Sequence, residues 1–404
     1  MKSTLYLTRN GLLEPLGRSQ VLAYLSDLSS KYKIVLITYE KPEDWIDKDA
    51  IENMYKYCND HGIRWLPQKF RSKPKLLAPL LSMIGMFLLA FTEVKRNNIR
   101  LIHARSYIPS RVALTVNKIT GIPFIFDMRA LWPEELIAAG RLRQGSLIHK
   151  VLLRVEKNCL QKSAAVVSLT NAAKKYLRKK YQVELNKKPI VVIPTCADLD
   201  KFHPAKDKKA GPLVHGCIGT LCSGWFRMDM LANWIKVVAL NDPDATFEIV
   251  TRDDAEFVRN FLDPKNDYIK RLNIASRSPE EMPKITRLHD LSLMFFTSGT
   301  SKLGSAPTRL AEALGSGLPV LTNDGVGDVA HIIQTNNVGI VLQSDSLDDM
   351  QTAYDNLKLL LQDPDLSRRC RIVAENIFSL KNGVKLYSDL YAQVMEENNP
   401  SCVA

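Results

Sequence analysis

Short apolar runs alternate along the chain with longer segments in which apolar residues recur every three or four positions. In the first half the apolar runs lie at residues 4–8, 34–38, 63–66, 101–104, 124–127, 165–169 and 190–193. Amphipathic segments, for example 19–30 and 144–160, separate them. Buried strands that alternate with helices are typical of βαβ units, so we predict a parallel sheet with helices on both faces.

The same alternation starts again after Pro194 and the polar stretch 202–212. The second set of expected strands and helices is 214–218, 228–240, 246–251, 291–296, 307–314, 319–322, 339–342 and 347–361. A chain of 404 residues is longer than one core usually organises. We therefore predict an α/β protein with two doubly wound Rossmann-like domains, 1–200 and 201–380, that face a central cleft. We expect the helical tail, about 380–404, to pack back on the first domain.

Composition and net charge indicate the kind of protein and the kind of ligand to expect. The hydrophobic fraction of 46% and the charged fraction of 24% are those of a globular protein. The net charge of +12 favours anionic partners, but zinc-finger spacing, RNA-binding aromatic motifs and basic-region helices are absent from the sequence, so nucleic acid is not expected. The seven cysteines lack metal-ligand spacing. We therefore expect reduced thiols in a cytoplasmic protein and no metal site. Because the sequence begins directly with an expected strand, we also expect no signal peptide.

The segment 302–320 carries the strongest chemical signal. It reads as a Gly/Ser loop, a helix that opens at Pro307, a glycine stop and a strand. Proline suits the first helical position, and the start of a helix attracts phosphate through its free N–H groups and its dipole. Lys302 and Arg309 add positive charge, and Glu312 is placed to accept hydrogen bonds from hydroxyl groups. A phosphate site with a carboxylate close by suits a nucleotide-sugar.

A glycine loop opens the second domain at 216–225, directly after a strand. Gly219 would let the backbone pass close to a ligand, although a tight turn alone explains such a loop equally well. Arg252 ends the next strand and can reach the same diphosphate; the alternative is a solvated charge at a helix cap.

These segments together resemble family 4 glycosyltransferases, which have the GT-B fold. The resemblance lies in the donor half at 219–225, 251–253, 307–312, 317–320 and 323–328, and in the first half at 11–20 and 126–135. It implies transfer of a sugar from a nucleotide-diphosphate donor to a glycan or lipid-linked acceptor, with retention and without a metal or other cofactor. By analogy, the setting is cell-surface polysaccharide or glycoconjugate biosynthesis.

The resemblance also assigns donor residues. Glu312 matches the second glutamate of the family's paired motif, which is associated with the donor ribose, and the first glutamate falls at Gly304. Lys302, Arg252 and Arg309 would stabilise the departing diphosphate. The other expected donor-binding residues are Gly219, Thr220, Thr251, Ser305, Pro307 and Thr308.

On the acceptor side, Asp127 and Arg129 share one face at the end of a strand. They are expected to orient a hydroxyl or to steady developing charge, and the alternative is a buried ion pair that ties the strand to Glu134 or Glu135. His103 is expected in the core. The expected acceptor-side residues are Gly17, Arg18, Ser19, Arg105 and Trp132.

One further region bears on location. Basic and aromatic residues interleave from Arg64 to Lys75, an uncharged run spans 76–91, and Lys95, Arg96 and Arg100 follow. The run is too short to span a bilayer. We expect the region from Arg64 to Arg100 to dock on an anionic membrane surface at the inner face of the cell membrane, whereas a helix buried in its domain is the alternative.

Two other functions fit the same fold. A nucleotide-sugar 2-epimerase would need additional acid–base carboxylates and histidines, and seven histidines offer few candidates. A catalytically inactive glycosyltransferase-like binding subunit is the other alternative, because Gly304 stands where the first glutamate is expected.

Overall fold

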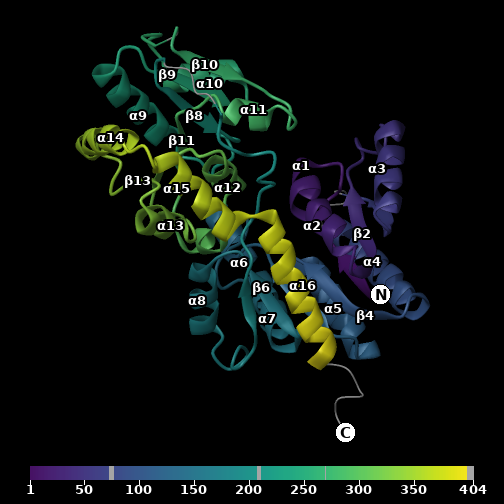
Figure 1. Ribbon diagram of the computed structural model, residues 1–404. Coiled ribbons are helices and arrows are strands. Elements are labelled where there is room, and N and C mark those ends of the chain that lie inside the picture. Colours follow the sequence, from purple (N-terminus) through teal and green to yellow (C-terminus); the bar gives the residue numbers. More distant parts are fainter. Residues whose placement is uncertain (72–76, 207–210, 269, 398–404) are drawn as a thin grey trace. The chain divides into compact units, whose positions relative to one another are not determined.

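The computed structural model describes residues 1–71, 77–206, 211–268 and 270–397 (Figure 1). The chain forms two compact units, one of Met1–Ile193 with Gly383–Ala404 and one of Pro194–Asn382. Lys73 and Lys75 of the expected membrane region, part of the polar stretch 202–212 and the end of the chain lie outside the described residues.

The first unit contains a seven-stranded sheet in the order β3-β2-β1-β4-β5-β6-β7, in which all neighbouring strands pair in parallel. Its strands are β1 (Lys2–Leu7), β2 (Tyr32–Glu40), β3 (Ile63–Lys69), β4 (Ile99–Arg105), β5 (Phe124–Met128), β6 (Ala165–Ser168) and β7 (Ile190–Val192). Its helices are α1 (Pro15–Gly17), α2 (Ala23–Leu28), α3 (Lys48–Asp60), α4 (Leu77–Arg96), α5 (Tyr107–Thr120), α6 (Trp132–Ala138), α7 (Leu147–Lys162) and α8 (Asn171–Lys180). A π-helical segment, Arg18–Leu22, joins α1 to α2.

The second unit repeats this plan with six parallel strands in the order β10-β9-β8-β11-β12-β13. The strands are β8 (Val214–Ile218), β9 (Thr246–Val250), β10 (Leu272–Ala275), β11 (Leu291–Met294), β12 (Val320–Asn323) and β13 (Gly339–Leu342). The helices are α9 (Met228–Asn241), α10 (Ala255–Leu262), α11 (Met282–Thr286), α12 (Thr308–Gly315), α13 (Val329–Asn336), α14 (Leu347–Leu361) and α15 (Leu366–Val373). A 3₁₀ helix (Thr300–Gly304) precedes α12, and a π-helical segment (Ala374–Phe378) follows α15.

Apolar residues on both faces of the strands explain why helices cover each sheet. In the first unit, Leu5, Ile102 and Phe124 are adjacent in the register of neighbouring strands and are fully buried. In the second unit one cluster gathers around Trp234 and Phe247 and another around Leu310 and Leu314. The predicted α/β architecture of two parallel sheets is confirmed.

Three local details differ from the sequence expectation. The sequence pattern does not predict the edge strand β10, because its four residues, Leu-Asn-Ile-Ala, give too short an apolar run. Helix α12 begins at Thr308 with Pro307 in an extended conformation as its N-cap, one residue later than predicted. The division after Ile193 groups residues 194–200 with the second unit, where the N–H of Ala197 donates to the carbonyl of Phe378 (2.9 Å).

The last helix, α16 (Leu380–Glu397), contributes to the core of the first unit. The Tyr32 hydroxyl donates to the Ser388 carbonyl (3.1 Å), and the rings of Tyr32 and Tyr391 meet edge to face with centroids 5.2 Å apart. Residues from the two ends of the chain therefore pack together in one unit (Figure 1).

A loop after β1 runs under helix α1 with little room. A Cβ built on Gly17 would lie 1.8 Å from the carbonyl oxygen of Gly11, a backbone atom that no rotamer change can move. Below this loop, the buried Glu40 carboxylate accepts the N–H groups of Leu12 (2.9 Å) and Leu13 (3.2 Å). The loop is thus fixed from both sides.

We predict opposite effects for two glycine substitutions in this unit. Gly17→Ala should lower the free energy of unfolding by about 3 kcal/mol because the methyl group meets backbone. Gly85→Ala, in the interior of α4 with open space around it, should raise the free energy by about 0.5–1 kcal/mol through helix propensity. Urea unfolding measures both, and equal stability of the two variants would contradict the packing described for Gly17.

Candidate active site

The expected donor residues gather at one edge of the second sheet. Strand β8 lies between β9 and β11, so the strand order reverses at the boundary of β8 and β11. Ligands in open parallel sheets bind beyond the carboxyl ends of strands at such a switch point. Gly219 and Thr220 follow β8, Thr251 and Arg252 follow β9, and the 3₁₀ helix and α12 follow β11.

A carboxylate at the end of β9 holds the glycine loop. Asp253 Oδ2 accepts the N–H groups of Leu221 (2.6 Å) and Cys222 (3.1 Å) and the hydroxyl of Thr251 (2.8 Å). Gly219 also donates its N–H to the carbonyl of Val250 (3.0 Å). Thr251 is buried and helps to hold Asp253 in place. Asp253 positions the glycine loop, and the sequence analysis does not single it out.

The start of α12 has the features of an anion site. No side chain caps the helix, so the N–H groups of its first turn lack a side-chain acceptor. Ser305, Pro307 and Thr308 are all partly buried around this helix end. The loop before it is held by the Thr195 hydroxyl, which donates to the carbonyl of Ala306 (2.5 Å).

Lys302 is buried against the end of the glycine loop. It is only 6% exposed, and its Nζ lies 2.8 Å from the centroid of the Trp225 ring. Its carbonyl accepts the N–H of Gly327 (3.0 Å), so the 3₁₀ helix is tied to the loop after β12. The Lys302 ammonium is therefore shielded from solvent. The sequence alone indicates only that a positive charge lies near the start of α12.

Glu312 and Arg309 form an ion pair with each other on α12. Burial raises the pKa of Glu312, and the Arg309 guanidinium opposes this shift. The pair matches the i,i+3 spacing of a helix surface. Arg252 is different: it is exposed, and none of the described residues forms a hydrogen bond or ion pair with it.

On the first unit, Asp127 is the centre of a buried polar network. It is fully buried, and its Oδ2 lies 3.1 Å from Nε2 of His103, 3.6 Å from Nη1 of Arg105 and 3.2 Å from the hydroxyl of Tyr387. Its other oxygen, Oδ1, lies 3.5 Å from Nη1 of Arg129. Asp127 and Arg129 are therefore brought together as an ion pair, and Arg105 joins them.

The network sets the charge of its members. Burial alone would raise the pKa of Asp127, but Arg129, His103 and Arg105 outweigh it and hold the pKa below its ordinary value. Burial lowers the pKa of His103, so the ring is neutral and bridges Asp127 to the Tyr391 hydroxyl (2.6 Å). His103 is a core histidine, as expected. Glu134 lies outside this network and pairs with Lys180 (3.0 Å).

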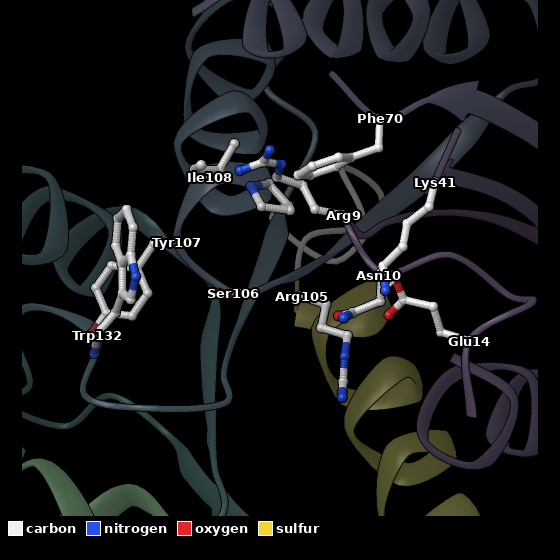
Figure 2. Close-up of a pocket in the computed structure, with 11 residues that line it drawn as sticks. Arg9, Asn10, Glu14, Lys41, Phe70, Arg105, Ser106, Tyr107, Ile108 and Trp132 are labelled. Atoms are coloured by element: carbon white, nitrogen blue, oxygen red, sulfur yellow. Dashed lines mark hydrogen bonds and ion pairs between the residues drawn. The ribbon is translucent and has the colours of Figure 1, made fainter. Parts of the chain in front are cut away.

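A pocket of about 340 Å³ opens at the carboxyl ends of β1, β2, β3 and β4 (Figure 2). It contains two of the expected acceptor-side residues, Arg105 and Trp132. The complete lining is Arg9, Asn10, Glu14, Lys41, Phe70, Arg105, Ser106, Tyr107, Ile108, Pro109 and Trp132.

The other expected acceptor-side residues do not line this pocket. Gly17 is buried against the Gly11 loop, whereas Arg18 and Ser19 are exposed on the following π-helical turn. Asp127 and Arg129 lie outside the lining as well.

Two buried groups fix the aromatic side of the pocket. The Tyr107 hydroxyl donates to Glu156 (2.5 Å) and accepts the N–H of Trp132 (3.3 Å). Glu156, on α7, is buried and also accepts the hydroxyl of Tyr181. Sequence patterns contain no signal for Glu156, since it sits as an ordinary acidic residue in a helical segment.

Comparisons with known proteins agree with this geometry. Residues 26–201 match the sequence model of Glycosyltransferase Family 4, and no curated protein matches the sequence. Sucrose-phosphate synthase from Thermosynechococcus elongatus is similar in structure, with a TM-score of 0.72, 13% identity and coverage of 98% of this chain and 100% of that chain. Anabaena HepE in complex with UDP has a TM-score of 0.70 at 14% identity, with coverage of 97% and 100%. WaaG, a glycosyltransferase involved in lipopolysaccharide biosynthesis, has a TM-score of 0.66 at 14% identity, with coverage of 96% and 99%.

The fold is the GT-B fold of these glycosyltransferases. The family match covers residues 26–201, which is most of the first unit, so this part of the chain resembles glycosyltransferase family 4.

The buried network around Asp127 gives a stability prediction. Asp127→Asn should lower the free energy of unfolding at pH 7 by about 3–5 kcal/mol, because it leaves buried guanidinium groups without their carboxylate. Since the folded pKa of Asp127 lies below its unfolded value, the stabilisation is complete above about pH 4 and is lost as the pH falls further. Urea unfolding from pH 7 to pH 3 should show the wild type approaching the variant.

The matched control is Asp389→Asn, which removes an exposed carboxylate paired with Lys385 on α16. Its effect should be about 0.5 kcal/mol or less. Equal losses in the two variants would contradict the role given to Asp127.

Proposed function

We propose that the chain transfers a sugar from a nucleotide-diphosphate donor to a glycan or lipid-linked acceptor, with retention and without a metal. The observation that carries this proposal is the uncapped start of α12 beyond the carboxyl end of β11, with Ser305 and Thr308 beside it. Oriented N–H groups at that point suit the negative charge that develops on a departing diphosphate. Lys302 and Arg252, at the same edge of the sheet, are the cationic side chains that we assign to the diphosphate.

The nucleotide is expected to lie along the glycine loop. Asp253 holds the backbone of this loop, and Thr220 is exposed within it. The structural neighbour HepE has been solved in complex with UDP and in complex with UDP-glucose. A uridine diphosphate sugar is therefore the first donor to test.

For catalysis, we assign Asp127 as a positioning residue. A general base must reach the proton that it removes, whereas both oxygens of Asp127 already face partners inside the protein. Its carboxylate fixes Arg105 and Arg129, and these guanidinium groups would steady charge on the acceptor side. In a retaining transfer without an enzyme nucleophile, the leaving diphosphate would accept the acceptor's proton.

The first experiment is incubation of the purified protein with a panel of nucleotide-sugars and detection of free nucleoside diphosphate. Slow release without acceptor supports the transferase. Conversion of the donor to its 2-epimer would favour the epimerase alternative, and binding without turnover would favour an inactive binding subunit.

Glu312→Ala tests the donor site. We expect at least a tenfold loss of nucleoside diphosphate affinity and of activity, because the carboxylate would otherwise accept ribose hydroxyls, while the melting temperature changes little. Isothermal titration with the nucleoside diphosphate measures the affinity. A matched control is Glu375→Ala, which removes an exposed carboxylate paired with Arg371 in the same unit. Unchanged affinity in Glu312→Ala would remove this residue from the site.

We also propose that the protein acts as a peripheral protein on the cytoplasmic face of an anionic membrane. No helix in residues 1–71, 77–206, 211–268 and 270–397 is long and apolar enough to cross a bilayer. Helix α4 nevertheless exposes Leu80, Ile84 and Leu88, which share one face at i,i+4 spacing and are about half exposed. The fully buried alternative for this helix therefore does not fit.

Basic residues flank the apolar stripe of α4. Arg71 precedes the helix and Lys95 and Arg96 end it, all three exposed. Arg64, by contrast, pairs with Glu93 (3.2 Å). An apolar face between cationic ends suits a helix that lies in the interface of an anionic bilayer. A role near a membrane also fits one structural neighbour, WaaG, which is involved in lipopolysaccharide biosynthesis.

Replacement of Leu80, Ile84 and Leu88 by Gln should reduce binding to vesicles that contain phosphatidylglycerol by at least tenfold, because each apolar side chain is worth about 1.5–3 kcal/mol when fully buried. Vesicle co-sedimentation measures the loss. The control replaces Leu147, Ile148 and Val151, which form a similarly exposed apolar stripe on α7. Equal vesicle binding by both triple variants would end the docking proposal.

A further inference from the structure

The pocket at the strand ends of the first unit is rich in positive charge. Its lining contains three cationic side chains, Arg9, Lys41 and Arg105, and one carboxylate, Glu14. Glu14 already pairs with Lys41, at 3.1 Å. Nothing in the lining balances the two guanidinium groups.

Arg9 has no acceptor among the described residues. Its guanidinium lies 5.0 Å from the centroid of the Phe70 ring, and its Nε is enclosed without a hydrogen-bond partner. An enclosed cation without a partner is costly, so a site that keeps one is suited to an anionic ligand.

Arg105 lies more deeply in the protein and is only partly paired, with Asp127 and the Tyr6 hydroxyl as its partners. The residue is 4% exposed, and its Nε also has no partner in the part of the chain that the structure describes. Only Nη1 meets a carboxylate, at 3.6 Å from Asp127, which Arg105 shares with His103 and Arg129. A buried guanidinium that lines the pocket therefore retains unused donor capacity.

The start of helix α5 adds N–H groups to the same pocket. Ser106 is its N-cap and donates its own N–H to the carbonyl of Asp127 (2.8 Å), and no side chain caps the helix. Pro109 has no N–H, so Tyr107 and Ile108 are the residues of this helix start that line the pocket with uncapped N–H groups. The helix has 14 residues, so its dipole adds a partial positive charge there.

The opposite side of the pocket is aromatic. Figure 2 shows Trp132 and Tyr107 beside each other, and their ring centroids are 5.5 Å apart. The Tyr107 hydroxyl accepts the backbone N–H of Trp132 and donates to Glu156, so the Tyr107 ring that packs against Trp132 is held in place. Rigid aromatic faces with polar groups nearby suit the mixed apolar and polar faces of a sugar ring.

We propose that this pocket binds the phosphate group of a phosphorylated sugar acceptor, with Arg9, Lys41, Arg105 and the start of α5 around the phosphate and Trp132 against the sugar. The inference rests on the proposed function, since it names the class of acceptor. A volume of about 340 Å³ matches a ligand of this size.

Phosphate fits the donor set better than a carboxylate does. Guanidinium groups bind phosphate oxygens through paired N–H donors, and a helix start adds backbone N–H groups. Lys41 can contribute as well, because its ammonium has three donors and only one is directed at Glu14. The phosphate can belong to a free sugar phosphate or to a lipid diphosphate that carries a sugar, and both present the same group.

Titration of the full-length protein with inorganic phosphate tests the site, with the donor site filled by whichever nucleoside diphosphate binds. Arg9→Gln should weaken phosphate binding at least tenfold, and Lys41→Gln at least threefold. Lys48→Gln is the charge-matched control, since Lys48 is exposed on α3 and does not line the pocket. It should bind phosphate like the wild type.

Equal phosphate binding by wild type, Arg9→Gln and Lys41→Gln would overturn the inference, as would the lack of any phosphate binding by the wild type. If Arg9→Gln has a lowered melting temperature, Lys41→Gln decides, because its side chain is half exposed and its loss leaves the core intact. Nucleoside diphosphate binding in the same titrations reports the proposed function separately. Its absence would refute the donor site whatever the phosphate result.

A turnover assay then separates the two sources of phosphate. Release of nucleoside diphosphate stimulated by glucose 1-phosphate, and not by glucose, would identify a soluble acceptor. Stimulation only by vesicles that carry an isoprenyl-diphosphate sugar would identify a lipid-linked one. In both cases Arg9→Gln should raise the KM for the phosphorylated acceptor at least tenfold, and an unchanged KM would contradict the assignment.

Discussion

Parallel strand pairing is the constraint on which the rest of this structure depends. Because neighbouring strands in both sheets run parallel, every strand must be followed by a crossover and all carboxyl ends meet at one edge of each sheet. Loops far apart in the sequence, such as those at Gly219, Thr251 and Ser305, are thereby collected at one edge. The same constraint collects Arg9, Lys41 and Arg105 in the first unit. Chemistry is possible at these edges because the strands bring the loops there.

The two units fix the loop after their first strand by the same means. In the first unit Glu40, at the end of β2, accepts two N–H groups from the Gly11 loop. In the second unit Asp253, just after β9, accepts two N–H groups from the glycine loop at Gly219. Both carboxylates also take a threonine hydroxyl, from Thr38 and Thr251. An acidic residue on the adjacent strand thus stabilises a loop whose backbone would otherwise lack acceptors.

Sequence pattern predicts the fold well and the side-chain partnerships less well. Strands such as β4 and β5 contain runs of apolar residues that the sequence pattern shows, whereas the short edge strand β10 contains no such run. Neighbours in one strand are also predictable, as with Asp127 and Arg129. Tyr387 is not, because its contact with Asp127 joins residues 260 positions apart, and no local period carries that information. The contact between Lys302 and Trp225 escapes the sequence for the same reason.

The pairing of the cations separates structural residues from candidate ligand groups. Arg227, for example, forms ion pairs with Asp229 and Asp345, and these two carboxylates account for its position without a ligand. Among the described residues, Arg9 lacks a carboxylate partner although it is partly buried, and Arg252 lacks one at the surface. An enclosed charge is costly unless it is compensated, so an unpaired guanidinium at the carboxyl edge of a sheet is better explained by an anion that binds there than by packing. This argument applies to Arg9 in the first unit, whereas Arg252 in the second unit is exposed and is assigned to the diphosphate by its position after β9.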